Sequence, residues 1–184
     1  MFDASGDFWF TDTGKFKGRE REVGSVFWAT IDGSRIVEVA HPAETPNGVG
    51  LSPDDRTLYY AETVTGRLRR RTVVGPAELE PLQGHGIESL VVGMPGQQPF
   101  DSLAVDAEGN VCIATFLTGC ITSISADGSS VVQYTFPPGL EDPMPTNICF
   151  GGPDLRTAYI TMAHTGRLLR CPWPTPGLKL NFNG

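Results

Sequence analysis

The chain has 184 residues, of which 40% are hydrophobic and 19% are charged. That length and balance fit one globular domain with a buried core, and they exclude a disordered chain. The 14 lysines and arginines stand against 21 aspartates and glutamates, which gives a net charge of −7. An acidic chain without a long basic run argues against binding to nucleic acid or to an anionic membrane surface.

The basic residues cluster once, at residues 67–71 (Arg-Leu-Arg-Arg-Arg), and we interpret this cluster as the solvated face of a strand. None of the four cysteines forms a Cys-x-x-Cys pair, so we expect buried or half-buried free thiols in a reducing compartment. No apolar run approaches the roughly 20 residues of a membrane span, and residues 1–6 do not read as a signal peptide. We therefore expect a soluble, cytoplasmic protein, whose oligomeric state the sequence leaves open.

Strand signals dominate, and no stretch keeps a helical period over a dozen residues. β-Branched and aromatic runs alternate with turns such as Asp32-Gly33 and Asp127-Gly128. The charged residues 15–22 and the glycine-flanked residues 75–86 are predicted to be loops. The expected strands are 8–12, 24–31, 35–40, 49–52, 57–61, 67–73, 87–92, 103–106, 110–115, 120–125, 130–136, 147–150, 157–162 and 167–171.

One phrase recurs along the chain: a polar residue, a short apolar strand, an Asp-centred turn and a second apolar strand. Its full copies begin at Asn47, Asp101 and Asn147, which lie 54 and then 46 positions apart, and a worn copy occupies residues 2–12. A repeat of about 40–50 residues with four short strands is typical of a β-propeller blade. A β-sandwich would not repeat the same phrase at this period.

The predicted fold is therefore all-β: a single partial β-propeller domain with blade units at about 1–42, 43–95, 96–140 and 141–184. The first unit lacks its leading strand, and the last unit has three strands. Because propellers commonly close by pairing both chain ends within one blade, we expect about four blades of a larger propeller.

Residues that lead equivalent inner strands of a propeller converge on its central channel. Asn47 and Asp101 would offer an amide oxygen and a carboxylate there, with Asn147 nearby. Oxygen ligands of mixed charge suit a hard cation such as Ca²⁺ or Mg²⁺. One carboxylate within hydrogen-bond reach of a water can also act as its base.

Plainer interpretations stay open for each of these residues. Asn47 precedes a glycine and can be a turn former, while Asp101 can be a turn acid that leads a strand. Asn147 can be an amide that caps an inner strand, and Glu62 is a lesser candidate for a substrate contact. The acids that follow the inner strands are predicted to be turn residues: Asp54, Asp106 and Asp154.

The chain resembles the senescence-marker-protein/gluconolactonase family of lactone hydrolases, the regucalcin-like six-bladed propellers. The resemblance covers nearly the whole chain and rests on residues 8–12, 46–54, 101–106, 147–154 and 176–178. It implies a six-bladed propeller with one divalent metal in the central channel, most often Ca²⁺, with Mg²⁺, Zn²⁺ or Mn²⁺ as alternatives.

By this resemblance, Asn47 matches a metal-ligating asparagine, and Asp101 matches a ligating aspartate that is also the proposed catalytic base. Ser102 matches a position that touches the metal in some relatives, and Asp12 matches a channel-facing acid. Asn147 remains a further candidate for a channel or substrate contact. The resemblance implies metal-dependent hydrolysis of a sugar-acid lactone of gluconolactonase type, with a small-molecule lactone as the partner.

Two parts of the family pattern have no match: a ligating Glu near the start of the first blade, and the Asn of the phrase before Phe2-Asp3. Both would lie upstream of Met1, so we expect an N-terminally truncated chain with impaired activity. Two alternatives remain open. One is a propeller that binds calcium or another ligand, or serves as a scaffold, without turnover. The other is a truncated product that folds poorly because its sheet edges are open.

Overall fold

The structure is a computed structural model, and it describes residues 1–84 and 89–182. Strands dominate these residues, and within them every strand expected from the sequence has a counterpart whose ends differ by a few residues at most. Residues 85–86 of the predicted loop 75–86 and residues 87–88 of the expected strand 87–92 lie outside the described residues. Within residues 1–84 and 89–182, no helix has the length and apolar character that crossing a membrane requires. The prediction of an all-β chain is confirmed.

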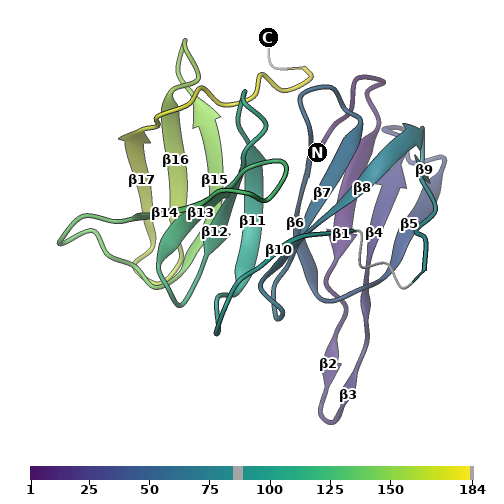
Figure 1. Cartoon of the computed structure of the whole chain (residues 1–184), viewed down its shortest axis with the longest axis horizontal. Coiled ribbons are helices and arrows are strands. Elements are labelled where there is room, and N and C mark those ends of the chain that lie inside the picture. Colours follow the sequence, from purple (N-terminus) through teal and green to yellow (C-terminus); the bar gives the residue numbers. More distant parts are fainter. Residues whose placement is uncertain (85–88, 183–184) are drawn as a thin grey trace.

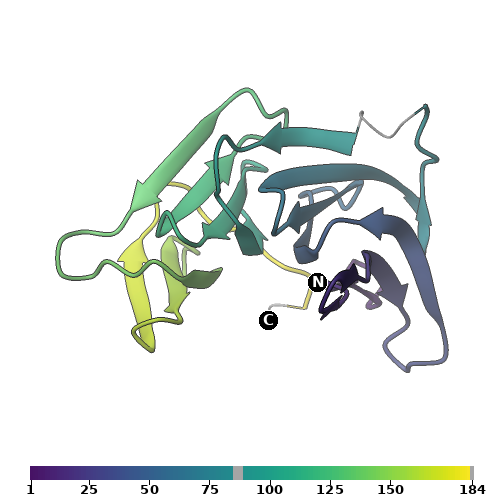
Figure 2. The same ribbon diagram turned by 90° about the horizontal axis from the view of Figure 1, so that it is seen from below.

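The longer strands form four antiparallel sheets, which follow one another along the chain and lie side by side in an arc (Figures 1 and 2). The first sheet has the order β1 (Phe8–Asp12), β4 (Gly24–Ala29) and β5 (Ile36–Ala43). The second has β6 (Pro46–Leu51), β7 (Thr57–Glu62), β8 (Arg67–Gly75) and β10 (Leu90–Gly93). The third has β11 (Phe100–Val105), β12 (Val111–Thr115), β13 (Cys120–Ile124) and β14 (Val131–Thr135), and the fourth has β15 (Pro145–Gly151), β16 (Thr157–Met162) and β17 (Arg167–Pro172).

Both predicted loops contain short strands, which corrects the sequence-based expectation. Residues 15–22 form a two-stranded ribbon, β2 (Phe16–Lys17) and β3 (Glu20–Arg21), that projects from one end of the first sheet (Figure 1). Within residues 75–86, β9 (Glu78–Leu79) pairs with β8. Strands of two residues are too short to show the alternation that reveals longer strands.

The apolar core lies between neighbouring sheets. One cluster joins the first and second sheets around Trp9 and Leu58, and a second joins the second and third sheets around Phe100 and Ile113. A third cluster, which includes Ile160, joins the third and fourth sheets. Because a middle sheet is covered on both faces, all five residues of β12 are buried, and its sequence reads as a continuous apolar run.

The inner strands β6, β11 and β15 pack beside one another in that order, and β1 packs against β6. β1 is the second strand of its unit, because residues 1–2 pair with its other edge through the Phe2–Phe8 bridge and the hydrogen bonds between Met1 and Trp9. The backbones of β6 and β11 approach closely at Gly48, where a Cβ atom would lie 2.7 Å from the Leu103 nitrogen and 2.8 Å from the Asp101 oxygen. A residue with a side chain does not fit there. These strands therefore line a common axis, and residues at their equivalent positions lie near one another.

The acids after the inner strands are turn residues, as predicted. Asp54 accepts hydrogen bonds from the Ser52 hydroxyl at 2.6 Å and from the Arg56 N–H at 3.1 Å. Asp106 is buried and accepts three hydrogen bonds, two of them from Asn110. Asp154 accepts one from the backbone two residues on. They stabilise the tight connections at the ends of β6, β11 and β15.

All four cysteines are free thiols, as expected, but Cys149 is exposed. The neighbouring Ile148 faces the core between the third and fourth sheets. Because side chains alternate along a strand, Cys149 lies on the opposite, uncovered face of β15.

We predict that Ile113→Ala lowers the free energy of unfolding by about 2–5 kcal/mol, because it empties space in the core between two sheets. Ile113 is 0% exposed. Urea unfolding followed by circular dichroism measures the change. Ile36→Ala is the matched control, since Ile36 is 62% exposed and should change stability by less than about 0.5 kcal/mol. Equal losses in the two variants would contradict the placement of the core.

Candidate active site

Three of the inner strands carry a register shift near their first residues, and the shift falls at the same place in each. The paired residues that bracket the shifts are Pro46 and Val49 in β6, Phe100 and Leu103 in β11, and Pro145 and Asn147 in β15. Each shift sets one extra residue against the partner strand. Such bulges bend a strand, re-aim its side chains and are common beside active sites. They mark this end of the inner strands as the candidate site.

The register decides which residues are equivalent. Counted from the paired residue before each bulge, Asn47 in β6 occupies the same position as Asp101 in β11. In β15 that position belongs to Thr146, and Asn147 is level with Ser102. The structure therefore brings Asn47 and Asp101 together, whereas Asn147 occupies the next position along its strand.

Asp101 is the half-buried acid of this site. Burial raises the pKa of its carboxyl group, while the Asn47 side chain and the Ser102 backbone N–H next to it act in the opposite direction. Among the residues that the structure describes, no Lys, Arg or His forms an ion pair with Asp101. Within these residues, the Asp101 carboxylate is thus a negative charge without an ion-paired cationic side chain.

The neighbouring strand β1 holds the backbone of Asn47. The Thr11 hydroxyl donates a hydrogen bond of 2.6 Å to the Asn47 carbonyl oxygen, a contact that sequence reasoning did not find. Asp12, the last residue of β1, is exposed and accepts a hydrogen bond of 2.9 Å from the Gly14 N–H. Asp12 therefore lies at the same end of the sheets, but its carboxylate caps the turn into the ribbon.

Asn147 and Ser102 contribute less to the geometry. Asn147 is exposed, and its side-chain oxygen accepts a hydrogen bond of 2.8 Å from the Ile148 N–H. This contact fits the strand-capping interpretation that the sequence left open. Ser102 is half-buried beside Asp101, and its backbone rather than its hydroxyl is the group that acts on the carboxylate.

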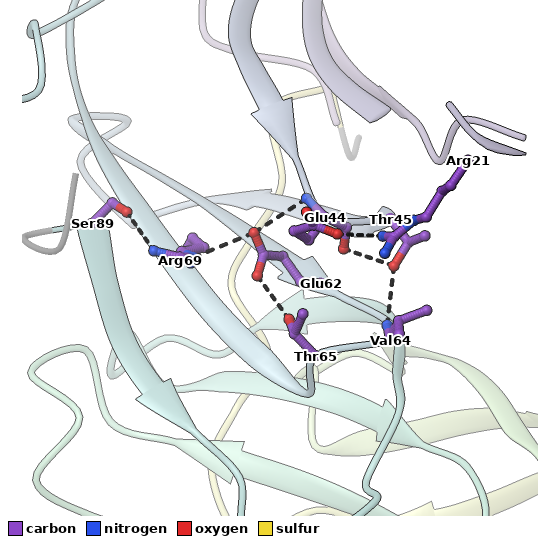
Figure 3. A network of polar contacts seen from close by, with 8 residues as sticks. All are labelled: Arg21, Glu44, Thr45, Glu62, Val64, Thr65, Arg69 and Ser89. Carbon is purple, nitrogen blue, oxygen red and sulfur yellow. Dashed lines mark hydrogen bonds and ion pairs between the residues drawn. The ribbon is translucent and has the colours of Figure 1, made fainter. Parts of the chain in front are cut away.

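Glu62 belongs to a separate, buried network (Figure 3). Its carboxylate lies 3.3 Å from Nε of Arg69, an ion pair without the alignment of a hydrogen bond. It also accepts hydrogen bonds from the Thr65 hydroxyl at 2.8 Å and the Glu44 N–H at 3.3 Å. Glu62 thus stabilises the fold, and its side chain is only 3% exposed.

Arg69 corrects the prediction that the basic cluster is a solvated face. Its side chain is 17% exposed and donates to the Ser89 hydroxyl at 3.0 Å, whereas Arg70 beside it is exposed. The alternation of β8 turns Arg69 toward the first sheet, on the same face as Tyr60. Arg21 of the ribbon pairs with the Glu44 carboxylate, which ties β3 to the same network (Figure 3).

The donors at the candidate site fit a hard cation. No group of three or more His, Cys, Asp or Glu side chains comes together in the described ranges, and the donors that the register brings together are Asn47 and Asp101. They supply an amide oxygen and an uncompensated carboxylate, the ligand types that Ca²⁺ and Mg²⁺ prefer. A calcium ion takes about 6–8 oxygen ligands, and this pair provides a part of that set.

Four antiparallel sheets in sequence, with the inner strands β6, β11 and β15 side by side, define a β-propeller, which confirms the predicted architecture; the total number of blades remains a prediction. The family described as SMP-30/gluconolactonase/LRE-like region matches residues 1–164. The chain belongs to this family, as its motifs predicted.

Relatives and solved structures agree with this assignment. The chain is 30% identical to lactonase drp35 of Staphylococcus saprophyticus over 138 residues. This alignment covers 74% of this chain and 41% of that protein. The chain is 28% identical over 141 residues to pentonolactonase XacC of Haloferax volcanii, covering 76% and 45%. The calcium-binding protein regucalcin from Agrobacterium tumefaciens shares the fold, with a TM-score of 0.75 at 19% identity over 97% of this chain and 63% of that one. The chain thus spans less than half the length of these two lactonases.

We predict that Glu62→Ala lowers the free energy of unfolding by about 3 kcal/mol, because it leaves the largely buried Arg69 without its partner. Chemical unfolding measures the loss. Glu22→Ala is the control: Glu22 pairs with Lys17 at 3.8 Å, but both side chains are more than half exposed. That change should alter stability by at most about 0.5 kcal/mol. A similar small change in Glu62→Ala would refute the buried network.

A further prediction concerns pH. Because the pKa of Asp101 is raised in the folded chain, the folded state holds this proton more tightly than the unfolded state does. Stability from Asp101 is therefore present at low pH and lost as pH rises through the interval between the two pKa values. In metal-free buffer, the stability of the unsubstituted chain relative to Asp101→Asn should fall across that interval.

Asp54→Asn tests the sign of this effect. Hydrogen bonds from Ser52 and the Arg56 backbone lower the pKa of Asp54, so its contribution to stability should rise with pH. Urea unfolding of the three chains at several pH values compares them. If Asp101 and Asp54 followed the same trend, the burial of Asp101 would be wrong.

Proposed function

We propose that this chain carries part of the active site of a metal-dependent hydrolase that opens a sugar-acid lactone. The observation that carries the proposal is the matched pair of bulges that sets Asn47 beside the half-buried Asp101. Its relatives include lactonases, one of them a pentonolactonase, and these names support the substrate class. A small-molecule lactone is the partner in this proposal.

Asn47 and Asp101 would hold the cation through their side-chain oxygens, with Ca²⁺ as the first choice and Mg²⁺, Mn²⁺ or Zn²⁺ as alternatives. The structural similarity to a protein described as calcium-binding supports that choice. When bound, such a cation supplies Lewis acidity to an ester carbonyl. Thr11 keeps the Asn47 backbone in place through its hydrogen bond of 2.6 Å.

Asp101 acts as the general base in this mechanism. Its carboxylate accepts a proton from the water whose oxygen attacks the carbonyl carbon of the lactone. The bond between that carbon and the ring oxygen then breaks, and the ring oxygen leaves as a hydroxyl after taking up a proton. One water is consumed, and the product is an open-chain hydroxy acid. Burial raises the pKa of Asp101, which makes it a stronger base than an exposed carboxylate.

A second candidate function is calcium or ligand binding without turnover. It is favoured by the small donor set, since no group of three or more His, Cys, Asp or Glu side chains comes together among the described residues. Calorimetric titration with Ca²⁺, alongside a rate assay on a panel of aldonolactones, separates the two functions. Binding with rates equal to the uncatalysed reaction would favour this second candidate.

We predict that Asp101→Asn lowers the rate of aldonolactone hydrolysis by about 10²–10⁴-fold, the usual contribution of a general base. Acid release from glucono-δ-lactone in the presence of Ca²⁺, corrected for the uncatalysed rate, measures it. The matched control is Asp154→Asn, a turn acid after the inner strand β15, which should keep the full rate. An unchanged rate in Asp101→Asn would exclude Asp101 as the base.

A further inference from the structure

Residues 173–182, here called the strap, cross the end of the sheets opposite the candidate site (Figure 1). They leave the fourth sheet after β17 and run past the turns of the other sheets toward the N-terminus. The described end of the strap lies close to the N-terminus in the second view (Figure 2), where Asn181 contacts Phe2. The strap therefore passes every sheet, in reverse chain order.

Backbone hydrogen bonds join the strap to the fourth and third sheets. They run from Gly177 N to Leu155 O at 2.8 Å, from Ala107 N to Pro176 O at 2.8 Å, and from Leu178 N to Val105 O at 3.1 Å. The Leu178 side chain packs on the core between the second and third sheets. The strap is thus part of the folded interior at these points.

Side-chain contacts carry the strap on to the second and first sheets. The Asn181 amide donates to the Asp55 carboxylate at 3.1 Å and to the Phe2 carbonyl oxygen at 3.4 Å. Asp55 follows β6, and its carboxylate also accepts a hydrogen bond of 3.1 Å from the Ala4 N–H. The Phe182 ring lies edge-on to Phe2, with centroids 6.3 Å apart.

Gly177 lets the strap lie this close to the fourth sheet. It is buried, and a Cβ atom at this position would come within 2.1 Å of Cβ of Phe150. The backbone φ of Gly177 is not in the left-handed region. Glycine is required here because there is no room for a side chain against Phe150, and not because of the backbone conformation. An added methyl group must push the strap away from β15.

The core clusters connect only neighbouring sheets, whereas the strap contacts all four. The turns that it holds directly follow β6 and β11, the two strands whose other ends carry Asn47 and Asp101. We propose that the strap is a brace that sets the angles between the four sheets, with Gly177 and Asn181 as positioning residues for the candidate site. This inference goes beyond the proposed function and rests on it only for the activity readout below.

Hydrogen exchange with residue resolution tests the brace. Gly177→Ala should speed exchange about tenfold or more at the Ala107 amide, which the strap binds, and also at the Trp9 amide. The Trp9 N–H donates to Met1 O at the edge of the first sheet, and the Trp9 ring N–H donates to Asp3, so neither hydrogen bond runs to the strap. The matched control is Gly93→Ala, whose added methyl would meet only the Arg67 side chain, with Cγ at 3.6 Å and Nε at 4.0 Å, and should leave both amides unchanged. Faster exchange confined to the surroundings of Phe150 and Gly177 would overturn the brace.

Asn181→Ala is the second, milder variant, which decides the matter if Gly177→Ala does not fold. It should speed exchange at the Ala107 amide, in the turn after β11, although the hydrogen bonds of the Asn181 side chain run to Phe2 and Asp55. In both variants kcat for lactone hydrolysis should fall while KM stays within about twofold, because positioning acts on the reacting groups. Faster exchange at the distant amides together with an unchanged kcat would overturn the positioning role. If the unsubstituted chain has no lactonase activity, the proposed function fails, and exchange alone judges the brace.

Discussion

The structure depends on one close approach, that of the first strands of neighbouring sheets at the common axis. At Gly48 the backbone of β6 leaves no room for a side chain against β11. This contact brings two bulges side by side, and the bulges bring Asn47 to the Asp101 carboxylate. The rest of the fold, from the core clusters between sheets to the network around Glu62, holds these strands in that arrangement.

Much of this fold could be predicted from the sequence because its repeats are periodic. The phrase that begins at Asn47 and returns at Asp101 identified sheets of short strands, and the turn acids such as Asp106 were recognised from their place after each strand. The ribbon at residues 15–22 was missed because its strands have two residues each. Arg69 was misplaced because a run of arginines does not reveal which member the strand turns inward.

The candidate site was predicted in part for a related reason. Asn47 and Asp101 were predicted as a pair because they lead equivalent strands, and the observed register gives them equivalent positions. Asn147 looked like their counterpart, but the bulge of β15 puts Thr146 there. A shift of one residue moves a side chain to the other face of a strand, and such a shift leaves no signal in composition. Thr11 was not expected because its contact joins two different sheets.

Each core cluster is shared by two neighbouring sheets, so this fold has a series of junctions in place of a single centre. The energy of such an array is close to a sum over its units and the junctions between them. Gain or loss of a whole unit then changes the junctions that this unit makes and the strap that crosses it, and leaves the packing inside the other junctions intact. A chain built in this way can change its number of sheets by duplication or deletion of a gene segment without redesign of the sheets that remain.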